Sequence, residues 1–132
     1  MNVEGTYAVL GIGGLFIRSP DPDALTQWYK DMLGVGAGCA PDGEPSEWSW
    51  RVGAGDVVFQ PFRQDSDYFA ADKAFMLNLR VRDLEGLIEA LESRGVAVEQ
   101  REEWNDPAVG HFARIHDPDG NPIELWEPAG VG

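Results

Sequence analysis

Residues 111–126 read HFARIHDPDGNPIELW and decide the fold, because they hold two alternating strands around a tight turn. Residues 117–121 gather Asp, Pro, Gly and Asn, the residue types that turns favour. The flanking segments His111 to His116 and Pro122 to Trp126 alternate between two faces. We therefore predict an antiparallel hairpin near the end of the chain.

The two faces of this hairpin differ in character. One is uniformly apolar and suited to lie under helices, whereas the other mixes charged, polar and aromatic side chains. A symmetric turn places Arg114 opposite Glu124, where a cross-strand pair would keep the carboxylate ionised without a metal. The apolar face carries Ala113, Ile115, Ile123 and Leu125, and the mixed face carries Phe112, Arg114, His116, Glu124 and Trp126.

Upstream of the hairpin, the sequence predicts a strand, a helix and a further short strand. Phe75 to Val81 alternates as a strand, and Asp83 is placed to cap a helix that Gly95 closes. Val96 to Gln100 is a candidate strand. The apolar stripe of the helix consists of Leu84, Leu87, Ile88 and Leu91.

The first half of the chain repeats this plan. A predicted strand at Leu10 to Arg18 precedes a helix that starts at Asp21 and Pro22 and stops at Gly34. After a loop rich in Gly and Pro, two strands are predicted at Trp48 to Val52 and Val57 to Phe62.

The capping aspartates of the two halves, Asp21 and Asp83, lie 62 positions apart. This order of elements predicts an α+β fold of two βαβββ modules in a single domain over residues 1–132. Module 1 spans about residues 8–62, a linker spans 63–73, and module 2 spans about 74–128.

Composition limits the classes of function. The 132 residues are 43% hydrophobic and carry 10 basic against 23 acidic side chains, for a net charge of −13. Such a chain folds, but it repels nucleic acid and anionic membrane surfaces. Cys39 is the one cysteine and has no partner for an internal disulfide, which indicates a reducing compartment. With no leader or membrane-spanning pattern in the sequence, we expect a soluble cytoplasmic protein.

Several runs of residues resemble the vicinal oxygen chelate superfamily, which contains glyoxalase I, bleomycin-resistance proteins and extradiol dioxygenases. The resemblance spans nearly the whole chain in the expected order. It implies a sheet cupped around a small-molecule site, a homodimer, and in many members a divalent metal held by four residues. The matching runs are residues 16–25, 28–29, 32–34 and 79–84, and above all 117–125.

Carried onto this sequence, the four metal positions of that superfamily fall on Gly14, Phe59, Met76 and Glu124. A shift of one residue would replace Phe59 by Gln60. Glycine and phenylalanine offer no donor atom and a thioether is too soft for Mg²⁺ or Mn²⁺, so one carboxylate remains. The two histidines, His111 and His116, fall on opposite faces of one strand.

We therefore expect a glyoxalase-like or bleomycin-resistance-like protein that binds an aromatic or cationic small molecule without a catalytic metal or other cofactor. The alternative is a metal-dependent lyase, isomerase or dioxygenase in which Glu124 and either His116 or His111 are ligands. Glu124 is also the candidate general base of a metal-free enzyme, so the sequence leaves open whether the protein is an enzyme. The predicted ligand-binding residues are Phe16, Trp50, Phe59, Met76, Asn78, Phe112, Arg114 and Trp126.

Overall fold

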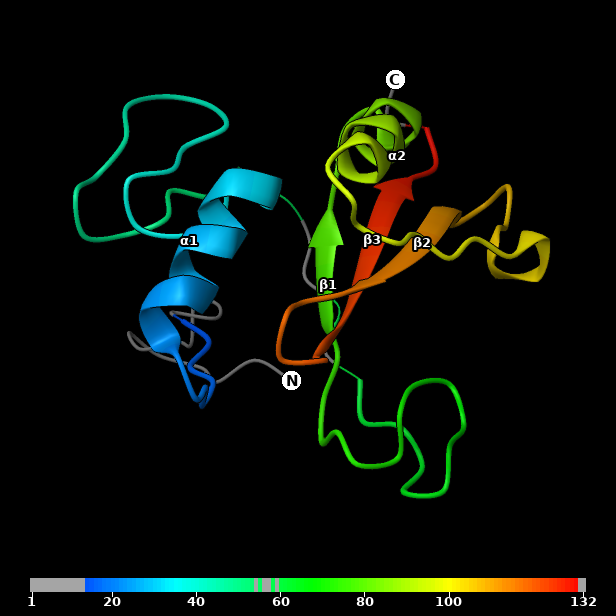
Figure 1. Ribbon diagram of the computed structural model, residues 1–132. Coiled ribbons are helices and arrows are strands. Elements are labelled where there is room, and N and C mark those ends of the chain that lie inside the picture. The colour runs from blue at the N-terminus through cyan, green and yellow to red at the C-terminus, as the bar shows by residue number, and fades with distance from the viewer. Residues whose placement is uncertain (1–13, 54, 56–57, 59, 131–132) are drawn as a thin grey trace, which may run out of the picture.

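The computed structural model describes residues 14–53, 55, 58 and 60–130. Its three strands form one mixed sheet in the order β1-β3-β2, in which β3 pairs parallel with β1 and antiparallel with β2. Two α-helices and one short 3-10 helix accompany this sheet (Figure 1). In chain order the elements are α1 (Pro22–Leu33), β1 (Leu77–Arg80), α2 (Leu84–Ser93), η1 (Glu102–Trp104), β2 (Gly110–His116) and β3 (Pro122–Pro128). The α+β class and the antiparallel hairpin predicted from the sequence are confirmed.

Both α-helices begin and end where the sequence places the signals. The carboxylate of Asp21 accepts a hydrogen bond from the N–H of Ala24, and that of Asp83 accepts one from Gly86. Gly34 adopts a left-handed conformation with φ of 65° and ends α1, as a glycine after a helix commonly does. Local capping therefore fixes the bounds of these helices.

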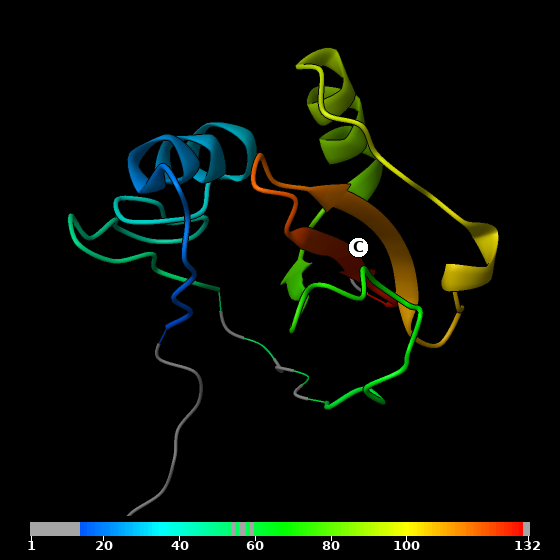
Figure 2. The same cartoon turned by 60° about the horizontal axis from the view of Figure 1, so that its bottom comes forward.

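The apolar face of the hairpin forms the core, as predicted. Ala113, Ile115, Ile123 and Leu125 are each 0% exposed. Leu84, Ile88 and Leu91 of α2 pack against them, and partly buried side chains of α1 add to the same cluster. Figure 2 shows both helices above the sheet and the segment that leads into β1 below it. The opposite face of the sheet is therefore left for the polar side chains.

The first half of the chain differs from the prediction. Residues 14–18 and 48–52 contain no strand, and the described part of 57–62 contains none either. Val96 to Gln100 contributes one bridge, between Glu99 and Arg114. Leu15 is 51% exposed and Trp48 is 85% exposed. The physical reason is that alternation yields a strand only where a neighbour pairs with its backbone and covers its apolar face.

The hairpin turn connects the two halves through one carboxylate. Asp117 is 4% exposed, and its Oδ2 accepts hydrogen bonds from the hydroxyl of Tyr29 at 2.8 Å and from the amide of Asn121 at 2.7 Å. Its Oδ1 accepts from the backbone N–H groups of Asp119 and Asn121. Tyr29 belongs to α1, so this side chain holds the first helix on the second half of the chain. Burial and the hydrogen bond to Asp117 raise the pKa of Tyr29 well above its usual value.

None of the helices in the described part of the chain is long and apolar enough to cross a membrane.

Candidate functional site

Glu124 is a carboxylate buried on the polar face of the sheet. It is 7% exposed and lies on β3 directly beside Asn78 of β1. Its Oε2 accepts a hydrogen bond of 2.5 Å from the hydroxyl of Tyr68, and its Oε1 accepts one of 2.8 Å from the amide of Asn78. Two neutral donors therefore hold the carboxylate in one orientation.

Arg114 lies opposite Glu124 in the hairpin register, as the symmetric turn predicted. The side chain does not make the ion pair that we expected, and among the described residues no carboxylate forms a salt bridge with it. Its guanidinium instead packs against two rings, with Cζ 4.9 Å from the ring centre of Tyr68 and 5.1 Å from that of Trp104. Nη1 donates to the backbone carbonyl of Tyr68 at 3.2 Å. Cation–π contacts with these two rings therefore replace the expected ion pair.

We refer to Tyr68, Asn78, Trp104, Arg114 and Glu124 as the Glu124 cluster. Asn78, Arg114 and Glu124 were predicted from strand alternation, whereas Tyr68 and Trp104 were not. Tyr68 lies in the polar stretch 63–73 that reads as a linker, and Trp104 lies in η1. The available signal was the presence of large aromatic residues in otherwise polar segments.

The other predicted ligand-binding residues lie in different surroundings. The rings of Phe112 and Trp126 stack on each other with centres 6.1 Å apart, on the same face as Glu124 but further along the hairpin. Trp50 is partly buried against the core, and Phe16 is 92% exposed. Met76 precedes β1 and is partly buried, and Phe59 lies outside the described residues.

Burial and the hydrogen bond to Glu124 raise the pKa of Tyr68 to about 12, against the opposing influence of Arg114. The phenol of Tyr68 is thus a neutral donor throughout the physiological range. With its proton in place it can hold a carboxylate or a ligand oxygen, but it cannot act as a base.

Alkaline titration tests this assignment. At about pH 11 a free tyrosine is mostly ionised, so the unfolded chain should absorb at 295 nm as phenolate from all three tyrosines, and the folded chain from fewer. Because the native state keeps protons that the unfolded state releases, stability should fall as pH rises from 10 towards 12. In Tyr68→Phe the difference in phenolate between unfolded and folded protein should shrink by one residue. An unchanged difference would contradict the raised pKa.

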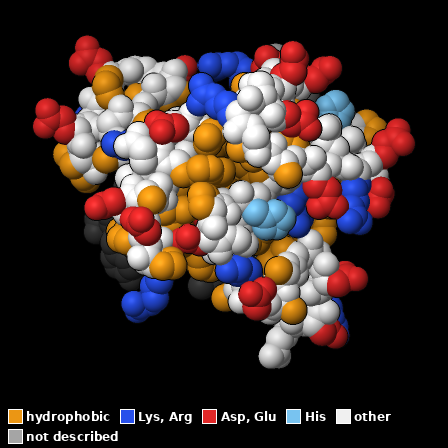
Figure 3. Space-filling model, viewed as in Figure 1, with side chains coloured by type: hydrophobic (Ala, Val, Ile, Leu, Met, Phe, Trp, Pro, Cys, Tyr) orange, Lys and Arg blue, Asp and Glu red, His pale blue; other side chains and the backbone are white. Residues whose placement is uncertain are grey.

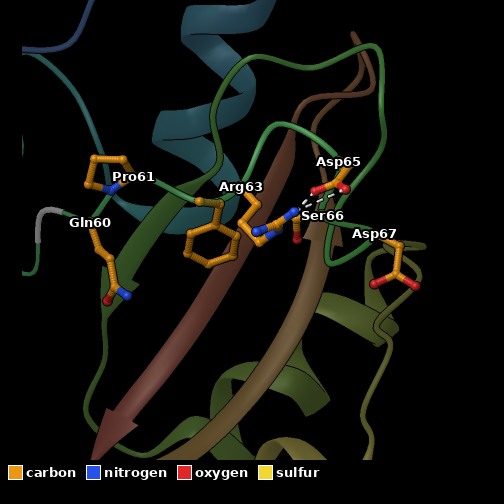
Figure 4. Close-up of a pocket in the computed structure, with 7 residues that line it drawn as sticks. Gln60, Pro61, Arg63, Asp65, Ser66 and Asp67 are labelled. Atoms are coloured by element: carbon orange, nitrogen blue, oxygen red, sulfur yellow. Dashed lines mark hydrogen bonds and ion pairs between the residues drawn. The ribbon is translucent and has the colours of Figure 1, made fainter.

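A second feature close to the cluster is an open depression of about 640 Å³ over residues 60–67 (Figure 4). Its ion pair joins Arg63 to Asp65 at 3.1 Å, and the two side chains are 85% and 74% exposed. Exposed pairs of this kind contribute little to stability or binding. The buried charges of the Glu124 cluster, and not this depression, therefore mark the candidate site.

The residues of the cluster do not fit a catalytic divalent metal. Both oxygens of Glu124 already accept hydrogen bonds, and the parallel register brings Asn78 and not Met76 beside it. His116 and His111 are both exposed, and they pair with Pro122 and Glu127 in the hairpin. Among the described residues no three His, Cys, Asp or Glu side chains are grouped as metal ligands, whereas catalytic metals usually take about three protein ligands.

The mixed sheet and the two α-helices of the described residues are consistent with the fold of the glyoxalase and bleomycin-resistance class. The family model of the glyoxalase-like domain matches residues 14–126. The chain therefore belongs to the glyoxalase-like domain family, within the vicinal oxygen chelate superfamily to which the sequence showed resemblance.

Solved structures agree on the fold. The antibiotic-binding protein TnmS3 from Streptomyces sp. CB03234 is 23% identical, with a TM-score of 0.60 over 94% of this chain and 100% of that one. An integron cassette protein from the mobile metagenome of the Halifax Harbour sewage outfall is 22% identical, with a TM-score of 0.50 over 88% of this chain and 99% of that one. No curated protein matches the sequence significantly.

Proposed function

We propose that this protein binds an aromatic small molecule at the Glu124 cluster and does so without a catalytic metal. The observation that carries the proposal is the buried carboxylate of Glu124, fixed by Tyr68 and Asn78 next to an arginine lined by aromatic rings. Aromatic walls with a few oriented polar groups are typical of small-molecule sites.

The relatives support the same kind of function. TnmS3, which shares the fold, is described as an antibiotic-binding protein. The net charge of −13 favours a cationic ligand over long range. Within the cluster, however, the charge of Arg114 and the occupied oxygens of Glu124 oppose a cation. We therefore favour recognition through the rings of Tyr68 and Trp104 over recognition of a positive charge.

A thermal-shift screen tests the proposal. Uncharged polycyclic aromatic compounds should raise the Tm of the protein, because a ligand that binds only the native state stabilises it. Trp104→Ala should weaken the best compound about tenfold, which corresponds to about 1.4 kcal/mol of lost aromatic contact. Phe75→Ala removes a ring that is 46% exposed and lies outside the cluster, so it serves as the matched control.

Two results would count against this function. One is an absence of stabilisation by every aromatic compound in the screen. The other is stabilisation by Mn²⁺ or Ni²⁺ that Glu124→Ala abolishes, which would favour the metal-dependent alternative.

We also propose that the protein is a homodimer. Apolar side chains of the first half point into solvent in the single chain, with Phe16 92% and Trp48 85% exposed. Exposed patches of this kind often mark contacts between subunits. Light scattering after size exclusion should give twice the chain mass of 14.5 kDa, and Trp48→Glu should shift the population towards the mass of one chain. A wild-type protein that stays monomeric at high concentration would rule this out.

The cytoplasm is the proposed location. The support is Cys39, a free thiol that is partly exposed and is stable in a reducing compartment.

A further inference from the structure

Arg114 holds two N–H groups that no described residue accepts. The residue is 5% exposed, and its Nε and Nη2 are both buried without a hydrogen-bond partner. Nη1 alone is engaged, by the carbonyl of Tyr68 at 3.2 Å. A buried donor without an acceptor is unfavourable and is rare in native proteins.

The two free groups share one edge of the guanidinium. Nε and Nη2 form a side of the planar fork whose spacing matches the two oxygens of a carboxylate. Because the rings of Tyr68 and Trp104 pack against the guanidinium, this edge is the part left for hydrogen bonding. The geometry of this edge therefore favours a planar acceptor with two oxygens.

Among the described residues no carboxylate makes a salt bridge with the guanidinium of Arg114. Glu124, the carboxylate opposite Arg114 in the register, is occupied by Tyr68 and Asn78 and makes no salt bridge. A buried charge is stable when a partner of opposite sign reaches it. The acidic surface does not attract anions from a distance, so such a partner would be held by local geometry.

The geometry points to an aromatic carboxylate as the ligand of this site, with its two oxygens on Nε and Nη2 of Arg114. This inference rests on the proposed function, because it names the chemical class of the ligand that the Glu124 cluster binds. The carboxylate meets the free edge of the arginine, and the ligand ring joins the aromatic side chains around it. Since both nitrogen atoms are buried, the ring of Trp104 or the segment around Tyr68 has to move aside on binding.

A matched pair of probes tests the inference. Isothermal titration of the full chain should show 2-naphthoate binding at least tenfold more tightly than 2-naphthalenemethanol, which has the same rings and no charge. Arg114→Gln should remove this preference, and Arg114→Lys should recover only a minor part of it, because lysine lacks the fork. Arg63→Gln, at an arginine whose side chain is 85% exposed, should leave it intact.

A measurement on the wild-type protein covers the case in which the Arg114 variants fail to fold. In ¹⁵N spectra of arginine side chains, one Nε–H should move downfield and exchange more slowly when naphthoate is added. Inorganic phosphate and naphthalenemethanol should not cause this change.

The outcomes separate this inference from the function on which it rests. Equal binding of the two naphthalene compounds, with loss in Trp104→Ala, would overturn the carboxylate assignment and leave aromatic binding in place. A preference for naphthoate that persists in Arg114→Gln, or that is lost in Arg63→Gln, would overturn it as well. Binding of neither compound would contradict both proposals.

Discussion

Asp117→Ala is expected to lower the free energy of unfolding by about 3 kcal/mol, because it removes a buried charged acceptor that serves several donors at once. The carboxylate of Asp117 is 4% exposed and accepts from Tyr29, from the side chain of Asn121 and from two backbone N–H groups of the turn. Its loss leaves those donors without partners and removes the side-chain hydrogen bond between α1 and the hairpin turn. Urea unfolding followed by circular dichroism measures the change.

Two other variants provide the scale for this effect. Tyr29→Phe removes only the hydroxyl that donates to Asp117, so we expect a loss of about 1 kcal/mol. Asp119→Ala removes a carboxylate whose Oδ2 is buried without a hydrogen-bond partner among the described residues, so we expect almost no loss. If Asp117→Ala destabilised the protein no more than Tyr29→Phe, the carboxylate would not organise the turn.

Gly110→Ala should destabilise the protein by about 3 kcal/mol, since the added methyl group meets backbone that cannot move away. Gly110 opens β2 with φ of +134°, and a Cβ there would lie 2.1 Å from the carbonyl oxygen of Glu127. Both the backbone conformation and the space exclude a side chain. The strand must therefore separate from β3 at this end to accept alanine.

Gly120→Ala is the matched control for Gly110→Ala. Gly120 also has a positive φ, of +83°, but a Cβ there would meet nothing within 4 Å. The free energy of unfolding of this variant should fall only by the conformational penalty of a positive φ, about 1 kcal/mol. Thermal unfolding of both variants distinguishes the two contributions, and equal losses would show that the contact with Glu127 is unimportant.

The sequence predicted the second half of the molecule well because its signals are local. Asp83 caps its helix, residues 117–121 form the turn, and the apolar face of the hairpin is buried, as the pattern of the side chains indicates. The same reasoning placed strands at Leu10 to Arg18 and Trp48 to Val52; residues 10–13 lie outside the described residues, and the described part of both segments contains no strand. An alternating pattern indicates a tendency to form a strand, but strand pairing also depends on a neighbouring segment that the pattern does not specify.

The candidate site also contains residues that local patterns predicted and residues that they did not. Alternation put Asn78, Arg114 and Glu124 on one face, and the register confirms that they are neighbours. The interaction of Arg114 with Glu124 was predicted wrongly because the sequence does not reveal that Tyr68, 56 residues before Glu124, donates to its carboxylate. Trp104 was missed because the sequence does not reveal that η1 brings its ring against Arg114.

Local signals in the sequence determined the helices and the hairpin, and they determined which residue types lie on each face of that hairpin. Tertiary structure decided which of those side chains meet, because segments distant in sequence come together only through the packing of the whole core. Glu124 is thus identified as a buried carboxylate by its strand, but its partner Asn78 follows from the β1–β3 register and its partner Tyr68 from where the loop before β1 lies. The free edge of Arg114 likewise exists only because that loop supplies the ring and the carbonyl group of Tyr68, and η1 supplies the ring of Trp104, where a carboxylate was expected.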